Sequence, residues 1–273
     1  MLKRSLFVLV LTALSLPYSQ GQTRVVKSER SIASSASTAR NPFMAGERLS
    51  YDVSWADFLI AGELTIQTDE RRNFDGIDGY HVTAQAKTVG LVSGLALKVN
   101  DVYESFINAS TLQPFRAEKR MRHGKKQAQS SVTIDQQHRV ALVTGGGTLE
   151  IPPDTYDLAG VIFAMRGMDL TPGKARTFTV IEDDKLYTIT VRPEAKEKIT
   201  TRAGSYETVR LATSMIKGRE NAKLYNLRMY ITNDSRRLPV LITADPPWGS
   251  VRVELTSAIP ERPQKQPYPR NQN

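Results

Sequence analysis

Apolar and polar residues alternate through most of this chain. Residues 49–55 read LSYDVSW, with apolar side chains at each odd position, and similar stretches recur almost to Leu255. A period of two is typical of β-strands that bury one face and expose the other. Roughly ten such stretches follow one another with one convincing helix among them. We therefore predict an all-β fold: a single antiparallel, partly open β-barrel-like sheet with one short helical insertion.

The expected helix lies where the alternation stops. Apolar residues at positions 158, 161, 162 and 165 follow helical spacing, Asp157 precedes them as a suitable N-cap, and Gly167 lies just past their end. Farther along, Asp183 and Asp184 separate two alternating stretches, which predicts a tight hairpin.

The first 21 residues have the layout of a secretory signal peptide. Lys3 and Arg4 precede an apolar stretch over residues 6–16, which ends at Pro17. This stretch is shorter than the about 20 apolar residues of a membrane-spanning helix. We therefore expect an exported, periplasmic protein that is cleaved near Gly21 and has no transmembrane span afterwards. The sequence contains no cysteine, so we expect no lipid anchor of the lipoprotein type, no disulfide and no thiolate metal site.

Composition sets the expected domain boundaries. Residues 22–42 are rich in Ser and Ala, and residues 259–273 contain four prolines. Such segments bury too little apolar surface to offset the entropy of ordering, so we expect both to be flexible. Residues 43–258 remain as one folded domain, a common size for an all-β protein.

The chain carries a formal net charge of +9. Outside the cytoplasm, this charge favours contact with anionic envelope components, such as lipid headgroups or acidic glycans, over nucleic acid. The alternative is that the excess of Lys and Arg serves only solubility.

No catalytic, metal-binding or cofactor motif is recognisable. The histidines at positions 81, 123 and 138 lack metal-ligand spacing, and we expect each at the surface. Gly-x-Ser-x-Gly does not occur, and the glycine run 145–147 lacks the Lys-Ser/Thr of a phosphate loop, so we interpret it as a loop hinge. The carboxylate pairs Asp75/Asp78 and Asp183/Asp184 lie in turn contexts, with a weak calcium site as the alternative. We predict no cofactor, no metal and no catalytic residue.

Two groups of residues are candidates for ligand binding. On the strand expected over residues 112–122, three arginines share one face. If that face points into a barrel lumen, they could hold an anionic headgroup, and if it points outward it is a solvated strand surface. Aromatic residues of the early strands line a lipid- or glycan-binding cavity or pack in the core. The candidate ligand-binding residues are Tyr51, Trp55, Tyr80, Tyr103, Arg116, Arg120 and Arg122.

Several stretches together resemble one family. Residues 43–55 read FMAGERLSYDVSW, residues 101–106 read DVYESF, residues 112–116 read LQPFR, residues 170–173 read LTPG and residues 233–240 read NDSRRLPV. In this order they resemble DUF3108, a family of exported bacterial proteins of unknown function, over about residues 43–255. The chain departs from the family pattern at Ala159-Gly160 and at Met229-Tyr230-Ile231. The resemblance implies an exported β-barrel-like domain and brings no established activity.

Together these features predict an exported, non-enzymatic protein of the cell envelope. We expect it to bind an apolar or amphipathic, lipid- or glycan-like component, or to act as an accessory in envelope maintenance. One alternative is a hydrolase of envelope glycan or lipid that uses carboxylates from separate strands. Another is a scaffold that contacts a second envelope protein.

Overall fold

A computed structural model describes residues 45–56, 59–90, 98–217, 220–222, 226–247 and 249–259. The expected signal peptide, the Ser/Ala-rich segment and residues 260–273 of the Pro-rich tail lie outside the described residues.

Strands dominate the described residues, which confirms the all-β class. The strands are β1 (Arg48–Trp55), β2 (Leu59–Thr68), β3 (Arg72–Phe74), β4 (Ile77–Thr88), β5 (Asn100–Asn108), β6 (Pro114–His123), β7 (Lys126–Asp135), β8 (Val140–Val143), β9 (Gly147–Glu150), β10 (Thr155–Tyr156), β11 (Arg176–Glu182), β12 (Lys185–Thr201), β13 (Gly204–Lys217), β14 (Glu220–Ala222), β15 (Arg228–Thr232), β16 (Pro239–Ala244) and β17 (Val251–Ile259). The described helix is α3 (Leu158–Gly167).

All the described strands belong to one sheet of 17 strands. The main path runs β9-β8-β7-β6-β5-β4-β2-β1-β17-β16-β15-β13-β12-β11-β10, with β3 beside β4 and β14 beside β13. Every pairing in the described part of the chain is antiparallel except β10 with β11, which is parallel. The predicted antiparallel sheet is therefore mixed, and it is not closed, because its path ends at β9 and at β10.

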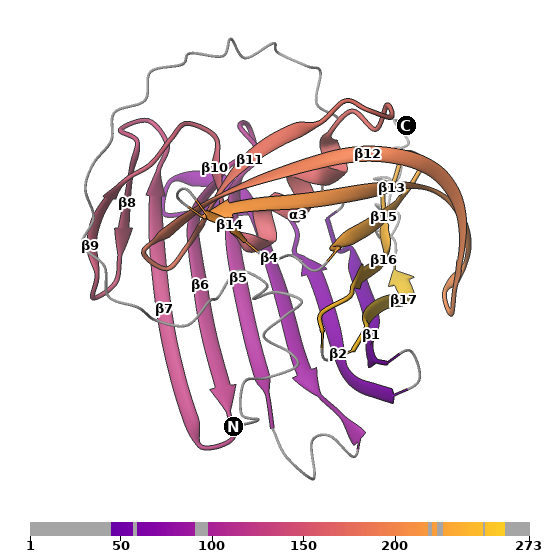
Figure 1. The fold of residues 1–273 in the computed structure, drawn as a ribbon. Helices are drawn as coiled ribbons and strands as arrows, with labels where there is room; N and C mark the ends of the chain where they lie inside the picture. Colours follow the sequence, from indigo (N-terminus) through magenta and orange to yellow (C-terminus); the bar gives the residue numbers. More distant parts are fainter. Residues whose placement is uncertain are drawn as a thin grey trace, which may run out of the picture.

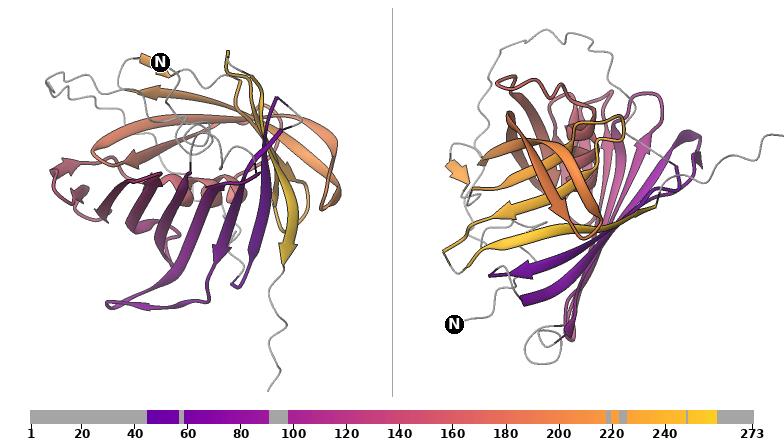
Figure 2. Two further views of the ribbon diagram at one scale, coloured as in Figure 1. Left: turned by 90° about the horizontal axis from the view of Figure 1, so that it is seen from below. Right: turned by 90° about the vertical axis from the view of Figure 1, so that its right-hand side faces the viewer.

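The sheet folds over helix α3. Figure 1 shows the long strands β12 and β13 running across β4, β5, β6 and β7, and Figure 2 shows α3 enclosed between these two parts. The helix contacts β4, β5, β10 and β11. We call the side of the sheet that faces α3 the inner face and the opposite side the outer face.

Strand β4 shows how the alternation sorts side chains between these faces. Tyr80, Val82, Ala84 and Ala86 are buried on the inner face, whereas the intervening residues, starting at His81, lie on the outer face. The predicted period of two is confirmed here. The main core consists of inner-face residues and one side of α3, as expected for a sheet that buries one surface.

Helix α3 begins as predicted. The side chain of Asp157 accepts a hydrogen bond from the backbone N–H of Gly160 (2.7 Å), which is the expected N-cap. The helix ends at Gly167, with Met168 as its C-cap, so it is slightly longer than the predicted segment.

Three local predictions need correction. The alternation predicts two strands here, over residues 186–192 and 197–201, whereas strand β12 runs unbroken through Pro193 with a register shift between Pro193 and Lys196. A register shift lets the sheet accept a residue that has no backbone N–H to donate. The glycine run contains a turn but also begins strand β9 at Gly147, and the turn region near Asn73 contains the short strand β3.

Candidate functional site

The aromatic residues proposed for ligand binding lie mainly inside the protein. Tyr51, Tyr80 and Tyr103 are buried on the inner face, and the hydroxyl of Tyr51 donates a hydrogen bond to the carbonyl of Pro239 (2.9 Å). Trp55 lies at the end of β1 and is partly exposed. Tyr51 and Tyr80 therefore serve as core residues, which was the alternative interpretation of these side chains.

The three candidate arginines lie on the outer face of β6. The Arg120 Nη2 atom is 2.6 Å from Glu104 Oε2, and Arg116 Nε is 3.4 Å from Glu118 Oε1. Arg122 is exposed on the same face. Because the tyrosines and the arginines occupy opposite faces, the structure does not bring the two groups into one site. Their role in ligand binding stays a prediction.

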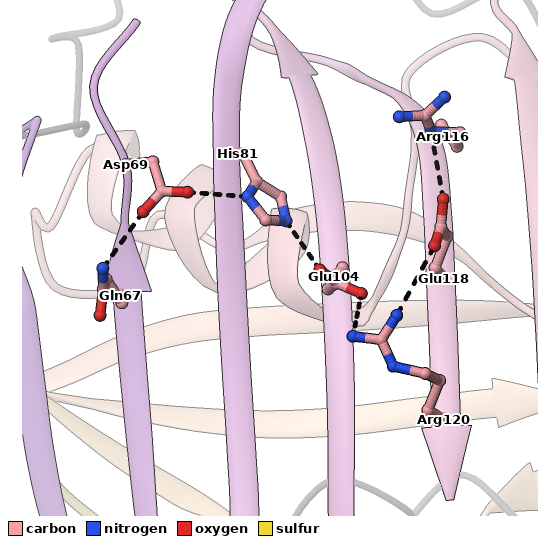
Figure 3. Close-up of polar contacts among 7 residues, drawn as sticks. All are labelled: Gln67, Asp69, His81, Glu104, Arg116, Glu118 and Arg120. Atoms are coloured by element: carbon pink, nitrogen blue, oxygen red, sulfur yellow. Dashed lines mark hydrogen bonds and ion pairs between the residues drawn. The ribbon is translucent and has the colours of Figure 1, made fainter.

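A chain of polar contacts crosses the outer face (Figure 3). Asp69 Oδ2 is 2.8 Å from His81 Nδ1, and His81 Nε2 is 3.1 Å from Oε1 of Glu104, which also contacts Arg120. The imidazole ring stacks on Phe106, with centroids 4.7 Å apart. The prediction of a surface position is wrong for His81, whose side chain is only 12% exposed. Both of its ring nitrogens have carboxylate partners. These contacts link β4 to β5 and to Asp69, which follows β2.

A shallow hollow adjoins two of the arginines. Arg120, Arg122, Gln127 and Gln129 line a volume of about 500 Å³ on the outer face of β6 and β7. Among the described residues, the Arg122 guanidinium has no hydrogen-bond or ion-pair partner. Val102, Met121 and Ala128 add apolar contact to this hollow, but no aromatic side chain lines it, so the predicted combination of tyrosines with arginines is absent from it.

A second group of polar residues lies on the inner face. Tyr103 of β5 pairs with Lys119 of β6, and Lys119 pairs with Ser130 of β7, so the three form a row across neighbouring strands. The β11–β12 hairpin brings two carboxylates to this row. Lys119 Nζ is 2.6 Å from Asp183 Oδ2 and 3.5 Å from Glu182 Oε1, and the Ser130 hydroxyl donates to Asp183 Oδ1 (2.7 Å).

The hairpin is held in this position by its turn and by packing. Asp183 has a φ of 52° in the predicted two-residue turn, a left-handed conformation that Asp tolerates well. Ile181, just before the turn, packs with Val132 and Ala141 in a small separate core. The backbone thus fixes Glu182 and Asp183 opposite the row of polar side chains.

These residues enclose a small polar cavity, which we call the hairpin pocket. It has a volume of about 40 Å³, and its polar lining side chains are Tyr103, Lys119, Ser130, Asp157, Glu182 and Asp183. The Tyr103 hydroxyl is buried and has no hydrogen-bond partner within the described structure. A buried polar group without a partner costs about 1–3 kcal/mol, so this pocket has an unused capacity for hydrogen bonding.

The pKa values of the two hairpin carboxyl groups are shifted in opposite directions. Burial raises the pKa of Glu182 above its usual value, against the opposing effect of Lys119. Burial acts in the same direction on Asp183, but the hydrogen bonds from Lys119 and Ser130 outweigh it and lower the pKa of Asp183. Burial also raises the pKa of the Tyr103 hydroxyl, and the nearby carboxylates add to this effect. Neighbouring groups with separated pKa values are typical of functional sites.

The hairpin pocket continues into a larger groove, which we call the hairpin groove. It has a volume of about 310 Å³ and shares Lys119, Ser130 and Asp183 with the pocket. Its other lining residues are Met121, Ala128, Gln129, Val143, Thr144, Gly145, Gly146 and Asp184. Apolar side chains and charged groups thus lie within one hollow, a common property of ligand sites.

Only Tyr103 of the predicted residues lines the hairpin pocket. The predicted β6 site used one face of the strand, whereas Lys119 lies on the other face, among inward-pointing residues. A lysine on the inner side of a strand was a signal in the sequence that something must pair with it. Asp183 was interpreted as a turn residue, with a weak calcium site as the alternative, because nothing in the sequence places the hairpin against β6.

The family resemblance can now be tested by comparison. A profile of the family described as "Protein of unknown function (DUF3108)" matches residues 50–256. The chain belongs to the DUF3108 family. The search of curated proteins found no match. Family membership therefore agrees with the prediction and assigns no activity.

One solved structure shows a similar fold. A β-barrel-like protein of the DUF1849 family from Brucella abortus has a TM-score of 0.57 at 11% identity, covering 79% of this chain and 97% of that one. A protein from Bacteroides fragilis, described as exported and YmcC-like in fold, has a TM-score of 0.35 at 11% identity, with coverages of 80% and 97%. A candidate lipoprotein from Parabacteroides distasonis has a TM-score of 0.33 at 9% identity, with coverages of 79% and 95%. The first of these supports a β-barrel-like architecture for DUF3108.

The described residues lack two kinds of feature. None of their helices has the length and apolar character needed to cross a membrane. They also hold no group of three or more His, Asp or Glu side chains arranged to bind a metal ion.

Proposed function

We propose that this DUF3108 protein is an exported protein of the cell envelope that binds one amphipathic ligand in the hairpin pocket and hairpin groove. The observation that carries the proposal is the buried hydroxyl of Tyr103, a residue that lines the hairpin pocket. This hydroxyl has no hydrogen-bond partner among the described residues. A bound group that exchanges a hydrogen bond with this hydroxyl removes the cost of leaving it unpaired.

The shape and lining of the hollow support an elongated ligand. The pocket of about 40 Å³ admits only a small polar tip, since one water molecule needs about 10–15 Å³ of such volume. The groove of about 310 Å³ has room for a longer body, and Met121, Ala128 and Val143 offer it apolar contact. A polar end and an apolar body together describe an amphipathic molecule.

The sequence supports an envelope location for this activity. The basic start, the apolar stretch over residues 6–16 and Pro17 have the layout of a cleaved export signal. Amphipathic molecules are abundant in the envelope, so an exported binding protein would meet such ligands there.

Substitution of Ala128 by Trp tests this proposal. Ala128 is an exposed residue of the hairpin groove on the inner face of β7, so an indole ring there fills the groove with little effect on the core. Thr133→Trp is the matched control, because Thr133 is exposed on the outer face of the same strand. We expect mass spectrometry of protein isolated from its native envelope to find a stoichiometric small molecule with the wild type and Thr133→Trp, and none with Ala128→Trp. Wild-type protein without any such molecule, or equal retention by both variants, would contradict the proposal.

The paired carboxylates favour a second candidate function. Glu182 and Asp183 have pKa values shifted in opposite directions, the property that allows one carboxyl group to act as acid and its neighbour as base. On this alternative the protein hydrolyses an envelope glycan or lipid. Incubation with isolated envelope material should then release product, and Glu182→Gln should abolish the release. Absence of product, or equal release by the variant, rules out the hydrolase.

A further inference from the structure

Charge is distributed unevenly around the hairpin pocket. Glu182, Asp183 and Asp184 of the hairpin turn lie together at the pocket and groove, and Lys119 is the cation among their polar lining residues. Lys119 is paired closely with Asp183, at 2.6 Å, and lies farther from Glu182, at 3.5 Å. The positive charge of Lys119 is thus matched by Asp183, and Lys185, which lines neither hollow, lies 3.9 Å from Asp184. Glu182 is left with only its long contact to Lys119.

The hydrogen-bonding capacity of Glu182 is also largely unused. Both carboxylate oxygens of Asp183 have partners, one in Lys119 and the other in Ser130. Glu182 is only 7% exposed, and its one ion pair within the described structure is the 3.5 Å contact with Lys119. A buried carboxylate is stable when a cation or several donors contact it.

The Tyr103 hydroxyl completes the set of groups that a ligand would meet. Its oxygen can accept a hydrogen bond, and it has no partner within the described residues. Glu182 and Tyr103 together therefore offer acceptors to a group that carries several donors. An ammonium group has three donors and no acceptor, and its charge complements the carboxylate of Glu182. An anionic group would instead meet the carboxyl groups of Asp157, Glu182, Asp183 and Asp184 and one paired lysine.

We infer that the polar tip bound in the hairpin pocket is a primary ammonium group, and that the ligand is an amphiphile bearing such a headgroup. This inference rests on the proposed function. It differs from the expectation of an acidic ligand group, which rests on the arginines of β6 and stays a prediction. The ammonium donates to Glu182 and to the Tyr103 oxygen, while the apolar body of the ligand lies along Met121, Ala128 and Val143 in the hairpin groove.

Three probes with the same eight-carbon chain separate the headgroup from the body. Octylammonium chloride, octyl sulfate and octyl glucoside are titrated below their micelle concentrations into the mature protein, and heats of binding give each Kd. We expect octylammonium to bind at least tenfold more tightly than octyl sulfate or octyl glucoside. Added salt should weaken octylammonium binding, because the contact is between opposite charges.

Two variants assign the selectivity to the pocket. Glu182→Gln keeps the side-chain shape and should reduce the preference for octylammonium over octyl glucoside to less than threefold. The control is Glu63→Gln, which removes an equal charge from an exposed ion pair with Lys87 and should leave the preference unchanged. Tyr103→Phe removes only the hydroxyl and should weaken octylammonium binding several-fold without lowering the Tm.

The outcomes distinguish the two proposals. If none of the three probes binds, the proposed function fails together with this inference. If octyl sulfate or octyl glucoside binds as tightly as octylammonium, the ammonium assignment is wrong while the binding function stands. A preference for octylammonium that persists in Glu182→Gln with an unchanged Tm also overturns the assignment.

Discussion

The carboxyl group of Asp157 contributes to both the cap of helix α3 and the lining of the hairpin pocket. It caps helix α3 through the N–H of Gly160, and it lines the hairpin pocket. Burial raises its pKa to about 6, although the hydrogen bond from Gly160 acts in the opposite direction. An ionised Asp157 is therefore less favourable in the folded chain than in the unfolded chain.

This pKa shift predicts a pH dependence of stability that Asp157→Asn removes. Because the folded pKa is above the unfolded value of 3.8, the contribution of Asp157 is fully present below about pH 4 and is lost as the pH rises through 6. The loss should be about 2–3 kcal/mol, at 1.36 kcal/mol for each unit. Asn keeps an oxygen for the cap. Urea unfolding of both proteins between pH 4 and 7.5 measures the difference, and a difference that does not change with pH contradicts this prediction.

Gly160 is required by the geometry of the same cap. A Cβ atom at this position would lie 2.5 Å from Asp157 Oδ1 and 3.6 Å from Cγ of Pro114. Ala normally stabilises a helix interior by about 1 kcal/mol relative to Gly, but overpacking costs about 1–3 kcal/mol.

We therefore expect Gly160→Ala to lower the free energy of unfolding by about 1–2 kcal/mol. In an Asp157→Ala background the crowded oxygen is gone, so the same substitution should be neutral or stabilising. Denaturant unfolding of the four proteins in this cycle checks the change of sign. Equal effects in both backgrounds would show that the cap does not determine the need for glycine.

Individual residues also show where sequence-based prediction ends. The sequence placed His81 on the polar face of its strand, and the structure agrees on the face. Its partners Asp69 and Glu104 are 12 and 23 positions away along the chain. The contact exists only because the β4–β5 register brings Glu104 beside it, and local patterns contain no information about that register.

At the scale of elements, helix α3 is anchored to the start of the domain by a buried ion pair. Arg166 Nη1 is 2.6 Å from Glu47 Oε2, and Arg166 Nη2 is 3.0 Å from Oε1. The same guanidinium donates to the backbone carbonyls of Arg236 and Arg237 at 3.0 and 3.1 Å. Three separate segments thus meet at one fully buried side chain.

Removal of one partner from this pair should be costly. Glu47→Gln leaves a buried, unbalanced guanidinium, and we expect a loss of about 3–5 kcal/mol in the free energy of unfolding. Arg166→Met leaves an unbalanced carboxylate and should cost a similar amount. The double variant should lose clearly less than the two single losses added together, because no isolated charge remains. Single losses below about 1 kcal/mol in urea unfolding would indicate that the pair contributes little.

The elements themselves were largely predictable, for physical reasons. A strand with one buried face needs a period of two, and a helix needs a cap, so β4, α3 and the Asp183-Asp184 hairpin follow from local residues. The prediction divided β12 into residues 186–192 and 197–201, and Pro193, a residue type that normally interrupts a strand, lies between them. The register shift beside Pro193 accommodates it, and such a shift depends on the neighbouring strand β13.

At the scale of the whole molecule, the pairing of β1 with β17 joins the two ends of the domain. The order of strands, and so the identity of the inner face, could not be derived from alternation alone. For the same reason the predicted site combined residues that point to opposite faces. The hairpin pocket depends on β11 and β12 folding back over β6 and β7, which is a property of the complete sheet.

Processing of the chain is a prediction at this scale. Residues 1–21 carry the pattern of a signal peptide, and we expect the mature protein to begin close to Gln22. N-terminal sequencing of protein from the periplasmic fraction measures this. Retention of residues 6–16 in an envelope fraction that resists salt and carbonate washing would contradict it.

The pairing of β1 with β17 also predicts how far the chain can be shortened without loss of the fold. Strand β1 pairs with both β17 and β2, so a chain of residues 43–259 keeps every described strand. We expect its Tm to lie within about 2 °C of that of the mature protein, since 1 kcal/mol corresponds to about 2–4 °C for a domain of this size. A chain that begins at residue 57 lacks β1, exposes the edges of two strands and loses the Glu47 partner of Arg166. It should not unfold cooperatively in circular dichroism melting experiments. A large decrease in Tm after removal of residues 1–42 would show that they belong to the folded domain.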